Sequence, residues 1–126
     1  MPVEILNPDG LPANPAFAQG TVASGQRIVV VGGQNGVTAD GTMADGLAAQ
    51  TERALRNVIT VLDAAGATPA DVARLGIYLV ESADPREAYA AVGPVWGPHA
   101  TAIVVLRVAG LARPDALIEI EALAAV

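Results

Sequence analysis

The sequence predicts an α+β domain in which a mixed β-sheet carries two helices on one face. Two helical segments interrupt a series of strand-like runs, which gives the order β-β-α-β-α-β-β along 126 residues. Two crossover connections in so short a chain place both helices on the same face of one sheet. The length suits a single domain, residues 1–126, with one hydrophobic core.

The N-terminal quarter predicts an arm followed by a hairpin. Residues 1–14 contain three prolines and a Pro-Asp-Gly turn, so we expect an irregular arm. Residues 17–23 read as a short strand, and a turn at 24–26 leads into the β-branched run 27–31. The run GGQNG at 32–36 is either a glycine-rich strand end or a loop where bare backbone approaches a ligand.

The two helices are predicted from apolar spacing and from end signals. Apolar residues recur at helical spacing over 45–65, and Gly66 ends that run. A short helical turn is expected at 68–71, where a threonine precedes a proline. Asp-Pro-Arg-Glu at 84–87 supplies a cap, a first-turn proline and a reciprocal acid for the second helix. We expect this helix to stop near 93–94, which is Gly-Pro.

Strands are expected at 72–81, 101–108 and 118–124, and the last of them has two unlike faces. Alternation places Ile118, Ile120, Ala122 and Ala124 on one face and Leu117, Glu119, Glu121 and Leu123 on the other. Two carboxylates bracketed by leucines suit neither a solvated surface nor a monomer core. We therefore expect another subunit to cover this second face, with a polar pocket in the interface.

The composition excludes several classes of function. The chain has no cysteine and no lysine, which removes disulfides, thiolate chemistry and Schiff bases. With His99 as the one histidine, no His-rich metal site is expected. A net charge of −6 opposes binding to nucleic acid. No apolar run spans a bilayer and no signal peptide is recognisable, so we expect a cytoplasmic protein without membrane contact.

The C-terminal segment LARPDALIEIEALAAV, with VAGLARP before the last strand and GGQ at 32–34, resembles the RidA (YjgF) family, also known as the endoribonuclease L-PSP family. The resemblance covers nearly the whole chain. It implies a homotrimer of the chorismate-mutase-like fold, in which three sheets form a central barrel and ligand clefts lie between subunits. It also implies hydrolysis of a reactive enamine or imine to a keto acid and ammonia, without a cofactor. High alanine and no lysine suggest GC-rich bacterial coding.

Several residues match the positions that carry chemistry in that family. By resemblance, Glu119 is the glutamate that positions the attacking water, and Gly33 is the backbone glycine of the pocket. Phe17 replaces the family's tyrosine, and Tyr89 falls near its asparagine. Glu119 has two interpretations: a structural carboxylate bonded across the subunit interface, or a general base in an apolar pocket. Glu121 is interpreted as structural.

The main departure concerns the arginine that binds the substrate carboxylate in typical deaminases of the family. Ile103 occupies that position, and Val105 stands where a polar or sulfur residue is common. Isoleucine cannot hold a carboxylate bidentately as an arginine does. Arg107 lies on the same strand face, roughly 13 Å from Ile103 along the strand. A register slip in the match would make Arg107 the candidate instead.

The sequence leaves two functions open. The first is a divergent RidA-like hydrolase that acts on an imine, an enamine or a related reactive metabolite through Glu119 and water. The second is a non-catalytic homologue that binds a small neutral or apolar metabolite between subunits. Phe17, Gly33, Tyr89, Ile103, Val105 and Arg107 are the expected ligand-binding residues.

Overall fold

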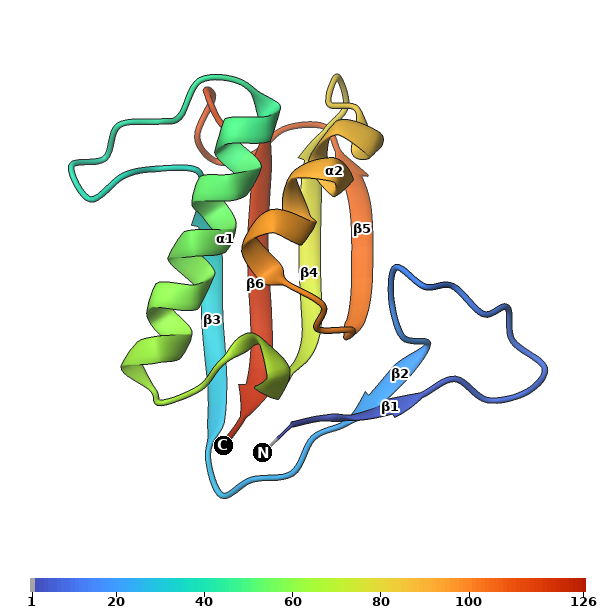
Figure 1. The fold of residues 1–126 in the computed structure, drawn as a ribbon. Helices are drawn as coiled ribbons and strands as arrows, with labels where there is room; N and C mark the ends of the chain where they lie inside the picture. Colours follow the sequence, from blue (N-terminus) through green and yellow to red (C-terminus); the bar gives the residue numbers. More distant parts are fainter. Residues whose placement is uncertain (1) are drawn as a thin grey trace.

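The computed structural model describes residues 2–126 and confirms the α+β fold with two helices on one face of a mixed sheet (Figure 1). The elements are β1 (Glu4–Leu6), β2 (Gly20–Val22), β3 (Ile28–Asn35), α1 (Leu47–Ala64), a 3-10 turn (Pro69–Asp71), β4 (Val72–Val80), α2 (Pro85–Trp96), β5 (Ala102–Val108) and β6 (Ile118–Ala125). The main sheet has the order β3-β6-β4-β5. Its β4–β5 pair is parallel, and both pairs that involve β6 are antiparallel.

The prediction of a hairpin between residues 17–23 and 27–31 is wrong. β2 pairs with β1, a strand inside the arm that we expected to be irregular, and these two strands form a separate small sheet. β3 pairs instead with the C-terminal strand β6, and Arg27 and Val126 exchange two backbone hydrogen bonds of 2.8 and 3.0 Å. This pairing places the apolar faces of β3 and β6 side by side under the helices, which the local hairpin could not do.

The glycine-rich run continues a strand. β3 extends through residues 32–34 to Asn35, and its register to β6 shifts between Val31 and Gln34. Such an irregularity reverses which face of the sheet the following side chains occupy. Val31 is therefore buried under the helices, whereas Asn35 lies opposite Glu119 on the other face.

The second helix passes the Gly-Pro pair at which we expected it to stop. α2 includes Pro94 and ends at Trp96, and the Gly97 amide closes the last turn on the Gly93 carbonyl at 3.0 Å. Proline lacks an amide donor and normally disfavours a helix interior. Trp96 is only 4% exposed, so burying a large indole favours the additional turn despite the proline.

The core lies between α1 and the sheet. α1 packs on β3 and β6 and beside α2. The predicted alternation of the last strand is confirmed, because its even-numbered residues are buried under the helices. The fully buried large side chains include Leu55, Val58, Leu62, Leu75, Leu79, Ile118 and Ile120.

The opposite face of the sheet carries no helix in Figure 1, and we refer to it as the open face. Ile28 and Val30 of β3 are 74% and 72% exposed there, and Val104 and Leu106 of β5 are also exposed. An apolar surface of this kind favours association with another protein surface. Neither helix of residues 2–126 combines the length and apolarity that crossing a bilayer requires.

Candidate functional site

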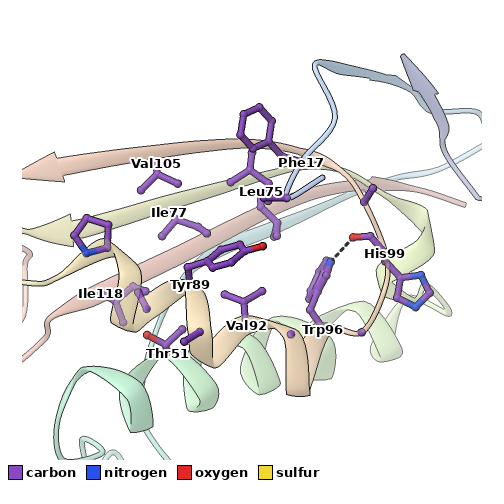
Figure 2. A pocket seen from close by; sticks show the side chains of 18 of the residues that line it. Phe17, Thr51, Leu75, Ile77, Tyr89, Val92, Trp96, His99, Val105 and Ile118 are labelled. Carbon is purple, nitrogen blue, oxygen red and sulfur yellow. Dashed lines mark hydrogen bonds between the residues drawn. The ribbon is translucent and has the colours of Figure 1, made fainter. Parts of the chain in front are cut away.

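The most prominent feature of the helix side is a cavity of about 700 Å³ between α2 and the sheet, shown in Figure 2. α2 buries two residues, Ala88 and Trp96, whereas α1 buries seven. Because so little of α2 is buried, space remains between it and the strands β4 and β5. A volume of this size suits a small metabolite.

Four of the predicted site residues line this cavity: Phe17, Tyr89, Ile103 and Val105. Ile103 and Val105 project from β5, where they lie beside Leu75 and Ile77 of β4 in register. The segment that carries Phe17 is held against β5 by the Ala18 amide, which donates to the Thr101 carbonyl at 2.9 Å. Residues far apart in the sequence therefore form one apolar wall.

The rest of the lining is mostly apolar. The sheet contributes Leu75, Ile77, Leu79 and Ile118; the helices and the loop after α2 contribute Thr51, Pro85, Ala88, Ala90, Val92, Gly93, Trp96, Gly97, Pro98, His99 and Ala100; and Pro15 and Ala16 complete the wall. Trp96 is packed in the core and also lines the cavity, a position that depends on the continuation of α2 past Pro94.

Few polar groups face the cavity. The Thr51 hydroxyl donates to the Leu47 carbonyl at 2.8 Å, and the Trp96 indole N–H donates to the His99 carbonyl at 3.2 Å. The His99 ring points away from the cavity in Figure 2. None of the lining residues within 2–126 is an arginine, aspartate or glutamate. The interior therefore offers no counter-charge to an ionic ligand.

Glu119 lies on the open face, across the sheet from the cavity. It is paired with Asn35 of β3, whose side-chain amide donates to its carboxylate at 3.1 Å. Gly33 provides the space for this carboxylate, since a Cβ on Gly33 would stand 2.5 Å from Glu119 Oε2. The two strongest matches to the family, Glu119 and Gly33, thus contact each other and not the cavity of the same chain.

A second carboxylate on the open face has a similar setting. Glu121 accepts a hydrogen bond from the Tyr78 hydroxyl at 2.8 Å. It also forms an ion pair with Arg74, whose Nη2 lies 3.2 Å from Glu121 Oε1. A Cβ on Gly76 would lie 2.8 Å from its Oε1. The hydrogen bond to Glu121 raises the pKa of Tyr78. The alternation of Arg74, Gly76 and Tyr78 along one strand is the only sequence signal for this cluster.

Arg107 does not line the cavity either. It shares the helix-side face of β5 with Ile103 and Val105, but its guanidinium donates to the Ala83 carbonyl at 3.0 Å, in the turn before α2. Among residues 2–126, no three histidine or acidic side chains lie close enough together to hold a metal ion.

Comparison with known proteins gives a consistent result. The family model described as endoribonuclease L-PSP matches residues 10–126. A search of the curated proteins gives no match. Among solved structures, the chain is similar to YyfB from Yersinia pestis, described as a protein of unknown function of the conserved Rid family, with 35% identity over 100% of both chains and a TM-score of 0.88.

Two further structures are more distant. One is Rv2704 from Mycobacterium tuberculosis, described as a member of the YjgF/YER057c/UK114 family, with 34% identity over 87% of this chain and 86% of that chain and a TM-score of 0.70. The other is the YjgF gene product from E. coli, with 27% identity over 86% and 87% of the two chains and a TM-score of 0.73.

Proposed function

Since this chain belongs to the endoribonuclease L-PSP family, which includes the RidA and YjgF proteins, we propose that it processes a small uncharged metabolite of the imine or enamine type. Family membership supports a small-molecule-processing protein. The observation that carries the proposed substrate class is the uncharged, apolar cavity around Ile103.

The absence of a cation from the lining argues against typical 2-imino acids. Moving a carboxylate from water into an apolar cavity is strongly unfavourable unless a charged or hydrogen-bonding partner receives it. Ile103 offers no such partner, and Arg107 donates instead to the turn before α2. An uncharged imine avoids this penalty and gains from contact with Phe17 and Val105.

In the proposed reaction, water adds to the carbon of the C=N bond while Glu119 takes one of its protons and passes that proton to the nitrogen. The remaining hydroxyl proton then moves to the nitrogen as the C–N bond breaks, so the nitrogen leaves as ammonia or an amine and the carbon becomes a carbonyl. Proton transfer of this kind contributes about 10²- to 10⁴-fold to a rate. The reaction needs no redox partner, because no electrons are gained or lost.

This mechanism requires a second copy of the chain. Within one chain the sheet separates Glu119 from the cavity. RidA-family proteins are typically small-molecule-binding homotrimers, and the exposed Ile28 and Val30 supply an apolar surface for such association. In the proposed homotrimer, Glu119 of one subunit reaches the mouth of a neighbour's cavity.

The alternative is binding without catalysis. It is favoured by the hydrogen bond between Asn35 and Glu119, which gives the carboxylate a structural partner on its own side of the sheet. A role in cleaving RNA, which the family description suggests, is opposed by the charge of −6 and the absence of lysine.

The test compares freshly generated 2-iminopropanamide with 2-iminopropanoate, which has the same shape but a negative charge. We expect wild-type protein to accelerate ammonia release from the amide and to act poorly on the acid. Glu119→Gln should abolish the acceleration, whereas Glu121→Gln, a matched change on the same strand face, should retain it. Ile103→Arg should increase activity on the acid. Binding of the amide without accelerated release would establish the non-catalytic alternative.

A further inference from the structure

The cavity contains one hydroxyl that is available to a ligand. Tyr89 lies on α2 and is 62% exposed, and its hydroxyl makes no hydrogen bond to any group of residues 2–126. We propose that Tyr89 determines specificity by donating a hydrogen bond to a carbonyl oxygen or imine nitrogen of the neutral ligand. This inference rests on the proposed use of the cavity, and it assigns the group that reads the ligand's polar end.

Elimination among the polar lining groups supports the assignment. The Thr51 hydroxyl and the Trp96 indole already donate to backbone carbonyls. The His99 ring points away from the cavity in Figure 2. Tyr89 therefore remains the side-chain donor that can serve a ligand without breaking a bond inside the protein.

The position of the Tyr89 ring also supports its assignment as the hydrogen-bond donor to the ligand. Figure 2 shows the Tyr89 side chain between Leu75 of the sheet and Val92 of α2, with its hydroxyl pointing along the cavity toward the end where Trp96 lies. The ring offers an apolar surface to the body of a ligand, and the hydroxyl offers a donor at the tip.

Surroundings of this kind make the bond selective. The cavity lining is mostly apolar, so a ligand acceptor that enters the cavity loses water and finds few other partners there. A ligand that lacks an acceptor loses little on entering but gains no hydrogen bond. The predicted preference is therefore for a neutral carbonyl or imine over a hydrocarbon of the same shape, and for both over an anion.

Three probes of nearly equal shape test this preference: 4-tert-butylcyclohexanone, its methylene analogue and 4-tert-butylcyclohexanecarboxylate. Trp96 is the one tryptophan of the chain and lines the cavity, so its fluorescence reports binding directly. Wild-type protein should bind the ketone best. Tyr89→Phe should weaken ketone binding about 3- to 10-fold, the usual effect of one neutral hydrogen bond, and leave the methylene analogue unchanged. Tyr78→Phe, which alters the other tyrosine on the opposite face, should change neither.

Several outcomes would overturn the inference. If Tyr89→Phe weakens the ketone and the methylene analogue equally, Tyr89 acts only through its shape. If it weakens neither, its hydroxyl does not contact the ligand. Both outcomes leave the proposed uncharged-ligand function intact. Wild-type binding of the carboxylate as tight as that of the ketone would instead refute the proposed function, and no binding of any probe would refute both.

Discussion

The two faces of the sheet carry different kinds of side chain. The helix side holds an apolar cavity without ionised groups, whereas the open face holds two carboxylates, each lying over a glycine of a neighbouring strand. Glu119 lies over Gly33 and Glu121 over Gly76. Under the proposed function, one face selects a neutral ligand and the other supplies the acid, so the two combine only when copies of the chain associate.

The largest expected effect concerns the core next to the cavity. Leu75 is fully buried and lines the cavity, so Leu75→Ala should lower the free energy of unfolding by about 2–5 kcal/mol. Urea denaturation measures this loss. Leu106→Ala on the open face removes the same atoms from a side chain that is 48% exposed, and it should cost less than half as much at a concentration where the chain is monomeric. Equal losses would mean that the two faces do not differ in burial.

The next prediction tests whether the open face is an interface. Val30→Asp places a charge on a side chain that is 72% exposed in one chain. If association buries Val30, the unpaired charge should raise the dissociation constant of the oligomer about 100-fold, as measured by analytical ultracentrifugation. Ala49→Asp, an exposed position on α1, is the matched control and should leave it unchanged. An unaltered oligomer in Val30→Asp would place the interface elsewhere.

A smaller effect is expected where glycine makes room for Glu119. The new Cβ of Gly33→Ala would stand 2.5 Å from the carboxylate, so the protein should lose about 1–3 kcal/mol of stability. Gly32→Ala, in the same strand, meets nothing within 4 Å and serves as the control. Adding Glu119→Ala to Gly33→Ala should recover most of the loss in thermal denaturation. Strictly additive losses would contradict the contact.

The smallest effect is a change in stability at alkaline pH. The hydrogen bond to Glu121 raises the pKa of Tyr78 above that of an unfolded tyrosine, so the fold favours the protonated phenol. Its stabilisation is complete below the unfolded value of about 10 and is lost as the pH rises through the folded value. Absorbance titration should show a tyrosine signal that moves to lower pH in Glu121→Gln and disappears in Tyr78→Phe. A signal that does not move would exclude Glu121 as the cause.

The sequence identified residues that lie close together in the fold, and their role toward a ligand stays a prediction. Phe17, Tyr89, Ile103 and Val105 do line one cavity, and Glu119 does adjoin Gly33. The sequence could not predict that the cavity residues and the Glu119–Gly33 pair lie on opposite faces of the sheet. A match to family positions along the chain does not show which face of the sheet each residue occupies. The shift of register between Val31 and Gln34 decides that for β3. Whether Arg107 serves a ligand remains a prediction.

The sequence alone determined the properties that depend on neighbours along the chain. Helical spacing over 45–65 and strict alternation over 118–124 determine which side chains are buried, because the periods of helix and strand follow from backbone geometry. Tertiary structure decided which strands pair and where α2 ends. β3 joins β6 and not β2, and burial of Trp96 extends α2 past Pro94, since contacts between distant residues outweighed the local turn and proline signals. The cavity is a consequence of that packing, and no local pattern encodes it.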